Sequence, residues 1–233
     1  MMSQPFVLFG YNHFTCDIAE IIQERGDWID CIVVNRPESA TAGKPTLEEW
    51  RLRQVALGQG SSVPELRVVP EAEFRPQAGQ RFVMGFSGPG QAPWVETLVA
   101  RHGIEFSSVV HPSAVVSRTA ILGAGCVVGA GAIVAAEVRL GRHVTLNRGC
   151  TVGHHCVVED YGMIQPGADV GSFVTVGRGA FVGLGAAVLQ DRRIGEFAQV
   201  AAGSLVLVDV PARTLVAGVP AVVKRLLTEN PVP

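Results

Sequence analysis

Long apolar runs, clusters of like charge and aromatic side chains are all scarce in this chain of 233 residues. No stretch of about 18 apolar residues is present, so we expect no transmembrane helix. The net charge of −2 gives no electrostatic basis for binding nucleic acid or an anionic membrane. The N-terminus lacks a basic segment followed by a cleavable apolar one, so we also expect no signal peptide.

The cysteines give no sign of a disulfide framework. Their number is odd and none belongs to a CxxC motif, which favours reduced, mostly buried thiols in a cytoplasmic protein. They are Cys16, Cys31, Cys126, Cys150 and Cys156. The chain is 48% hydrophobic and 17% charged, which is typical of a globular protein. Because aromatic residues make up only 6% while glycine occurs 27 times, the composition also indicates an internal repeat.

A strict period of six residues runs through the second half of the chain. Every sixth residue from Val110 to Val206 is Val, Leu or Ile, without an insertion. Counting these as position one, position two of the hexads is often Gly and position five is mostly small. This period fits neither an α-helix nor a two-faced strand, but is typical of a parallel β-helix built from hexapeptides. We expect positions one and five to point into a triangular prism, and position-two glycine to permit the bend.

The first hundred residues show a different pattern, in which apolar strands alternate with amphipathic helices. We expect strands at 6–10, 30–35 and 81–86, and helices at 15–26, 46–57 and 93–103. Thr15 is a candidate cap, and Thr46 with Glu49 forms a capping-box pattern. This alternation predicts a small parallel α/β unit. We place a Rossmann-like α/β domain for sugar or nucleotide at 1–108 and the β-helix with a C-terminal cap, whose tail could be helical, at 109–233.

Three features together resemble a known family, the hexapeptide-repeat acyltransferases. They are the hexads, the segment AGVPA at 217–221, and a histidine at position three of a hexad. The segment VVHPSAVVS at 109–117, after a short α/β domain, resembles sugar acyltransferases related to sialic-acid O-acetyltransferase. It resembles equally the N-acetyltransferases of nucleotide-linked 4-amino sugars. The resemblance implies a left-handed β-helix, although the general rule for crossovers would predict a right-handed one.

The same resemblance implies a homotrimer that uses acetyl-CoA as co-substrate, without a metal, in polysaccharide or glycoprotein synthesis. The general base of the family maps to His154 in the segment GHHC. An ordinary histidine pKa of about 6.5 suits a base near neutral pH. In the family this base lies in a groove between two prisms, along which acetyl-CoA lies. Asn147 matches an asparagine at the substrate end, and the N–H of Ser172, one coil after His154, is our candidate oxyanion donor.

One residue departs from the family, which usually has Asp or Glu directly after the base. That place holds His155, which cannot act as an anion, although we count it with the catalytic residues as a neighbour of the base. Glu159 or Asp160 in the next hexad could substitute. Otherwise His154 is a weaker base, or the acceptor is an already deprotonated amine.

Two binding sets also follow from the resemblance. The lower coils and the GVPA segment would bind CoA through backbone amides, with a cation for the phosphates. That set is Ala186, Ala202, Gly203, Gly218, Pro220, Ala221 and Lys224, with Arg225 as an alternative cation. The sugar or nucleotide would contact Gly10, His13, Asn35 and Arg36. The turn FGYNHF lacks one glycine of the family. The identity of the nucleotide therefore stays open, and a free or lipid-linked sugar remains an alternative substrate.

Other functions remain alternatives. A γ-type carbonic anhydrase would bind zinc through three histidines, but the spacing of the histidines at 111, 143, 154 and 155 does not reproduce its pattern. We expect His111 to be structural at the domain junction and His143 to be a solvated corner residue. A sugar O-acetyltransferase and a non-catalytic sugar-binding trimer also stay open. No Ser or Cys stands beside a base with an orienting acid, so we expect direct transfer without an acyl-enzyme.

Overall fold

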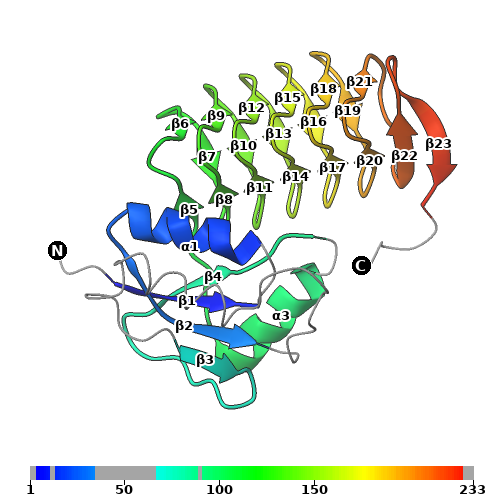
Figure 1. Ribbon diagram of the computed structural model, residues 1–233. Helices are drawn as coiled ribbons and strands as arrows, with labels where there is room; N and C mark the ends of the chain where they lie inside the picture. Colours follow the sequence, from blue (N-terminus) through cyan, green and yellow to red (C-terminus); the bar gives the residue numbers. More distant parts are fainter. Residues whose placement is uncertain (1–3, 11–13, 35–66, 89–90, 228–233) are drawn as a thin grey trace, which may run out of the picture.

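The computed structural model describes residues 4–10, 14–34, 67–88 and 91–227 (Figure 1). The first domain is a four-stranded parallel sheet of order β3-β2-β1-β4, with helices on both faces. Its elements are β1 (Pro5–Phe9), α1 (Phe14–Glu24), β2 (Trp28–Val34), β3 (Arg67–Pro70), β4 (Arg81–Met84) and α3 (Gln91–His102). The expected strands and the first and last helices are therefore present, whereas β3 was not predicted. The expected helix at 46–57 lies outside the described residues.

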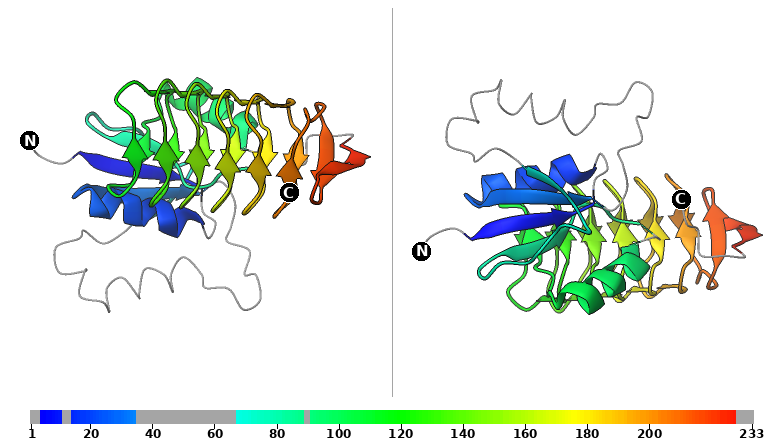
Figure 2. Two further views of the ribbon diagram at one scale, coloured as in Figure 1. Left: turned by 90° about the horizontal axis from the view of Figure 1, so that it is seen from above. Right: turned by 90° about the horizontal axis from the view of Figure 1, so that it is seen from below.

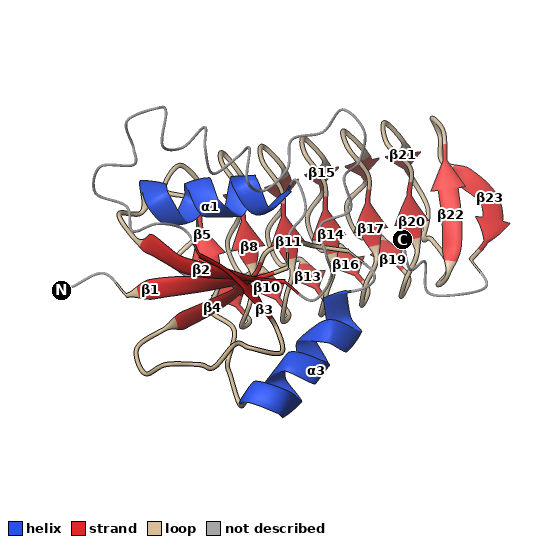
Figure 3. Ribbon diagram, turned by 60° about the horizontal axis from the view of Figure 1, so that its bottom comes forward, coloured by secondary structure: helices blue, strands red, loops and turns tan. Residues whose placement is uncertain are grey.

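Alternation along β1 explains how the two helices are held. Figure 3 shows α1 and α3 on opposite sides of the sheet. Phe6 and Leu8 pack with the apolar side of α1, whereas Val7 and Phe9 pack with α3. All four side chains are fully buried, as expected for a central strand of a parallel sheet. Thr15 does not cap α1 as predicted, because it lies inside the helix and its hydroxyl donates to the Gly85 carbonyl at 2.6 Å.

The second domain is a left-handed parallel β-helix, as the hexads and the family resemblance predicted. Each strand has two residues and pairs with the strand one coil away, and the strands form three sheets around a prism. The first sheet contains β5 (Val109–Val110), β8 (Val127–Val128), β11 (Thr145–Leu146), β14 (Met163–Ile164), β17 (Phe181–Val182) and β20 (Gln199–Val200). The second contains β6 (Val115–Val116), β9 (Ile133–Val134), β12 (Thr151–Val152), β15 (Asp169–Val170), β18 (Ala187–Val188) and β21 (Leu205–Val206). The third contains β7 (Ile121–Leu122), β10 (Arg139–Leu140), β13 (Val157–Val158), β16 (Thr175–Val176) and β19 (Arg193–Ile194).

The hexad positions have the roles expected of them except at position two. From Val128 to Val206 the residues of position one are buried in a single core, joined by small residues of position five such as Cys126 and Ala168. From Gly125 to Gly203 the left-handed backbone of each corner falls at position four, as at His155, and not at the position-two glycines. A Cβ on position-two Gly123 would lie 2.6 Å from the backbone of Gly141 in the next coil. Glycine is thus needed there because neighbouring coils approach closely.

The C-terminal cap is a hairpin, not the short helix that the sequence suggested. β22 (Thr214–Ala217) extends the first sheet beside β20, and β23 (Val222–Leu226) pairs with it antiparallel. The hairpin closes the far end of the prism, where it is seen at the red end of the chain (Figure 1). All residues of β23 are exposed. Within the described residues, no helix is long and apolar enough to cross a membrane.

The first domain lies beside the early coils, against the first sheet of the prism (Figure 2). His111 Nε2 contacts Glu24 Oε2 of α1 at 2.9 Å, so the predicted structural role at the junction is consistent with its position. Arg148 reaches Asp17 of α1 at 3.1 Å.

His143 also belongs to this junction and is not the solvated corner residue that we predicted. Only 5% of it is exposed, because its ring stacks on Tyr161 at 5.3 Å and meets the edge of Phe106 at 5.1 Å. Burial, together with the nearby positive charge of Arg142, lowers the pKa of His143 to about 4.

Candidate active site

His154 and His155 lie at the corner between β12 and β13, where the prism turns from its second sheet to its third. Both side chains are exposed, and their Nδ1 atoms are 3.1 Å apart, within hydrogen-bonding distance. His155 occupies the left-handed corner position with φ of 59°. Its N–H donates to the Ala136 carbonyl of the preceding coil at 3.0 Å, which fixes the backbone that carries the pair.

Phe173, one coil later at the same corner, contacts both imidazoles. Its ring stacks on His155 at 5.0 Å with an interplanar angle of 24°, and presents an edge to His154 at 5.1 Å. Its backbone N–H donates to the His154 carbonyl at 3.0 Å. Sequence reasoning missed Phe173, although the eighteen-residue coil step that led from His154 to Ser172 leads equally from His155 to Phe173.

The backbone N–H of Ser172 lies at the same corner and has no hydrogen-bond partner among the described residues. Gly153 of the preceding coil lies next to this N–H. A side chain there would crowd it, because a Cβ on Gly153 would lie 2.7 Å from the Ser172 nitrogen. A backbone N–H without a partner beside an exposed imidazole can stabilise a negative oxygen next to a proton acceptor. The two groups that the sequence assigned to base and oxyanion donor are thus brought together on one corner.

Asn147 is separated from this corner by a strand. It lies at the corner before β12, whereas His154 lies at the corner after β12, and only 8% of Asn147 is exposed. Its side-chain oxygen accepts a hydrogen bond from the Arg148 N–H at 2.8 Å. Within the described residues the structure records no contact between Asn147 and His154.

Glu159 and Asp160 do not replace the missing acidic neighbour of the base, because they lie at the next corner and are engaged there. Glu159 accepts the N–H of Arg178 at 2.9 Å. Asp160 accepts the N–H of Arg142 at 2.7 Å and pairs with its guanidinium at 2.8 Å. Partial burial opposes ionisation of Asp160, but these bonds from Arg142 hold its pKa below the ordinary value.

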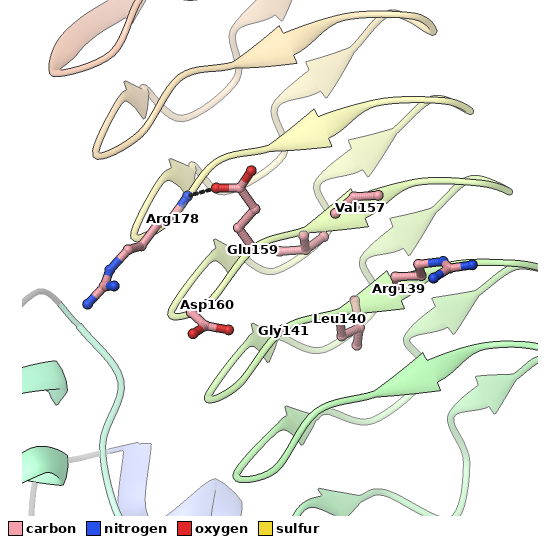
Figure 4. Close-up of a pocket in the computed structure, with 8 residues that line it drawn as sticks. Arg139, Leu140, Gly141, Val157, Glu159, Asp160 and Arg178 are labelled. Atoms are coloured by element: carbon pink, nitrogen blue, oxygen red, sulfur yellow. Dashed lines mark hydrogen bonds between the residues drawn. The ribbon is translucent and has the colours of Figure 1, made fainter.

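A groove of about 400 Å³ runs along the third sheet between β10 and β13, and it does not include the imidazole pair. Figure 4 shows Glu159 bonded to the backbone of Arg178 at one end of this groove, with the Arg178 side chain directed away from it. Arg139 projects at the other end. Both acidic groups of the groove already accept hydrogen bonds, and His154 lies outside the groove, at the corner before β13. We therefore do not assign the reaction to this groove.

The backbone of the expected CoA set offers fewer free amides than the sequence suggested. Ala186 is fully buried, its N–H donates to Gly183, and its carbonyl accepts from Asp169, so the structure leaves it no group for a ligand. The N–H groups of three further members are also used within the chain. Gly203 donates to Leu184, Gly218 to Ser204 and Ala221 to Leu205.

Ala202 and Lys224 keep groups that suit a phosphate-bearing ligand. The N–H of Ala202 has no partner among the described residues. The residue next to it in the preceding coil is Gly183, whose lack of a side chain leaves room there, since a Cβ would lie 2.6 Å from the Ala202 nitrogen. Lys224 is an exposed cation on β23, and Pro220 is exposed in the turn before it. The hairpin cap therefore supplies the positive charge, while one coil supplies an open amide.

The expected sugar site is described only in part, because His13, Asn35 and Arg36 lie outside the described residues. Gly10, at the carboxyl end of β1, has φ of 84° and donates to the Val33 carbonyl. A Cβ on Gly10 would meet the rings of Phe86 and Trp94, which stack on each other at 5.5 Å. Ligands of parallel α/β sheets commonly bind at this edge. Trp94 was not predicted as a site residue.

Among the described residues, no three or more His, Cys, Asp or Glu side chains are grouped so that they could hold a metal ion.

No protein-family model matches the chain, and no curated protein matches it.

Several solved structures are similar over nearly the whole chain. A single-residue mutant of perosamine N-acetyltransferase from Caulobacter crescentus, in complex with CoA and GDP-perosamine, is 25% identical, with a TM-score of 0.77 over 95% of this chain and 97% of that one. The acetyltransferase domain of PglB from Neisseria gonorrhoeae is 24% identical, with a TM-score of 0.77 over 95% of this chain and 100% of that one. WeeI from Acinetobacter baumannii is 18% identical, with a TM-score of 0.76 over 94% and 99%.

Proposed function

The chain has the architecture of the hexapeptide-repeat sugar acyltransferases, and from this premise we propose that it is an acetyl-CoA-dependent sugar N-acetyltransferase. The acceptor we propose is the amino group of a nucleotide-linked 4-amino sugar. The structural neighbour crystallised with CoA and GDP-perosamine supports this class of substrate. A cytoplasmic location is part of the proposal, and five free cysteines favour a reducing compartment.

One observation carries the proposal: an exposed imidazole with a hydrogen-bonded Nδ1 lies beside an uncovered backbone N–H at a single corner of the prism. In the proposed reaction, Nε2 of His154 takes a proton from the sugar amine as its nitrogen bonds to the acetyl carbonyl carbon. The Ser172 N–H donates to the resulting oxyanion. When the intermediate collapses, the carbon–sulfur bond breaks and CoA leaves as a thiolate, which takes up the proton.

A homotrimer is also part of the proposal, because a single prism leaves the pair open to solvent. The first domain packs against the early coils of the first sheet, so the second and third sheets are available to neighbouring copies. Val115 and Ile133 on the second sheet and Ile121 on the third are exposed, between 45% and 63%. Exposed apolar side chains on these faces support burial against another copy. In this arrangement Asn147 would contact the acceptor from the far end of β12.

The two binding sites of the proposal use the groups that remain free. Ala202 and Lys224 would bind CoA through the open amide and the cation. The edge of the first sheet at Gly10, with the stacked Phe86 and Trp94, would bind the nucleotide sugar together with His13, Asn35 and Arg36.

The test is an assay of CoA release from acetyl-CoA with UDP-, GDP- and dTDP-linked 4-amino sugars. We expect turnover with at least one of them, and a loss of at least a hundredfold in kcat in His154→Ala. Sedimentation of that variant should give the same assembly as the wild-type chain. Undiminished turnover in His154→Ala would remove this residue from its role. An acetylated product that mild alkali cleaves would indicate O-acetylation, the sialic-acid type of reaction, in place of an amide.

A further inference from the structure

The residue that follows the proposed base carries a second imidazole where the family usually has a carboxylate. We propose that His155 is a positioning residue, which accepts a hydrogen bond from Nδ1–H of His154 and so holds the lone pair of His154 on Nε2. This inference rests on the proposed function, and it assigns to a neutral side chain the orienting part that an anion has in the family.

Two contacts restrict the ring of His155, and a backbone hydrogen bond fixes its main chain. Its Nδ1 lies 3.1 Å from Nδ1 of His154, and its ring stacks on Phe173. Its backbone N–H donates a hydrogen bond to the Ala136 carbonyl of the preceding coil, and the Phe173 N–H donates to the His154 carbonyl. The three side chains therefore form a closed set across two coils, in which Phe173 also supports His154 edge-on.

The short separation of the Nδ1 atoms limits the tautomers of the pair. When both rings are neutral, one Nδ1 must carry the proton and the other the lone pair. Only the arrangement in which His154 donates leaves its Nε2 free to accept a proton from the acceptor amine. His155 then carries its own proton on Nε2. When His154 becomes an imidazolium, its Nδ1–H still donates to His155, so the hydrogen bond is kept throughout the reaction.

Unlike an Asp or Glu at this place, His155 supplies no negative charge beside His154. One coil to either side, the charged groups at the same corner are Glu137 before His155, and Asp191 with Arg192 beyond Phe173. None of the three has a recorded contact with either imidazole among the described residues. His154 is thus suited to an acceptor amine that reaches the site uncharged.

The first test does not need a substrate. The full chain is labelled with ¹⁵N-histidine, and the ring nitrogens of His154 and His155 are assigned by comparison with His154→Gln and His155→Asn. At pH 8 we expect His154 protonated on Nδ1 and His155 protonated on Nε2. A His154 ring protonated on Nε2, or one that exchanges freely between tautomers, overturns the proposal.

The second test compares pH profiles of kcat/KM in three variants at residue 155. His155→Asn keeps an acceptor and tolerates the left-handed backbone, so we expect kcat within about threefold of wild type. His155→Leu removes the acceptor, and we expect kcat to fall about tenfold or more with an unchanged KM for acetyl-CoA. In His155→Glu we expect the ascending limb to move up by about one pH unit, because an adjacent anion raises a histidine pKa. Glutamate fits the backbone, since Glu137 holds the equivalent position with φ of 60°.

Phe173→Leu should reproduce part of the kcat loss of His155→Leu. Its matched control is Phe197→Leu, which changes the same hexad position, at φ of 54°, on a different corner. Equal kcat values and superimposable pH profiles for wild type and all three variants at 155 would refute the positioning role. Absence of turnover in the wild-type chain with every sugar would refute the proposed function instead, and the tautomer measurement would still decide the role of His155.

Discussion

Acid should weaken this protein through one buried imidazole, that of His143 at the junction of the two domains. The folded state holds its pKa near 4, whereas the side chain of an unfolded chain has a pKa of about 6.5. Between these values the unfolded chain binds the proton more readily than the folded one. The contribution of His143 to stability is therefore complete above pH 6.5, and it is lost progressively as the pH falls toward 4.

The difference of about 2.5 units corresponds to about 3 kcal/mol once both states are protonated, and to about 2 kcal/mol at pH 5 relative to pH 8. A direct comparison is His143→Phe, which cannot titrate. Phenylalanine suits this backbone, because Phe173 and Phe197 occupy the same hexad position with φ of 59° and 54°. It also removes the Nδ1 atom, which is buried and has no hydrogen-bond partner among the described residues.

The measurement is urea unfolding of both chains at pH 8 and pH 5, at one protein concentration. Other titrating groups are common to the two chains, so they cancel in the difference between them. We expect the variant to gain about 2 kcal/mol over wild type on going from pH 8 to pH 5. Equal losses of stability in the two chains would show that His143 is not held neutral by its burial against Phe106 and Tyr161.

Three further outcomes are expected. Gly153→Ala should lower kcat about tenfold or more by covering the Ser172 N–H, whereas Gly171→Ala, which crowds the next amide of the same corner at the same 2.7 Å, should leave kcat near wild type; equal kcat losses would refute the oxyanion role. The thiols of Cys126 and Cys150, whose pKa values burial raises to about 11 and about 12, should resist iodoacetamide at pH 8 until urea unfolds the chain; rapid labelling of the folded chain would contradict this. Lys224→Ala should raise the KM for acetyl-CoA several-fold at constant kcat, and an unchanged KM would exclude Lys224 from the phosphate site.

The prism could be predicted because one rule governs nearly every residue in it. An aliphatic residue at every sixth position leaves few other ways to bury a core, and the strands of the structure fall where the hexads place them. The corner with His154 was equally predictable, since coil arithmetic places Ser172 beside it. The hexad position with the left-handed backbone could not be predicted in this way. The glycines of position two are needed for close contact between coils, whereas the positive φ angles occur two residues later.

Features that depend on the meeting of two parts of the chain could not be read from the pattern. Corner position four of a hexad is exposed at His155 but buried at His143, and the difference arises because Phe106 of the first domain covers the latter. The hairpin of β22 and β23 likewise follows from the open edge of β20, not from local propensity. The pairing of Phe86 with Trp94 joins residues on either side of a loop, and no local signal marks it.

The coil-to-coil register restricts how the length of such a chain can change over time. Arg139 pairs with Val157, and Thr151 with Asp169, each eighteen residues further on. Loss of a single residue within a strand would put the aliphatic column after it out of register with the coils before it, whereas loss of a whole turn leaves the remaining layers matched. Relatives of this protein should therefore differ in the number of complete turns, or by extra loops at the corners, and hardly ever by single residues within the walls.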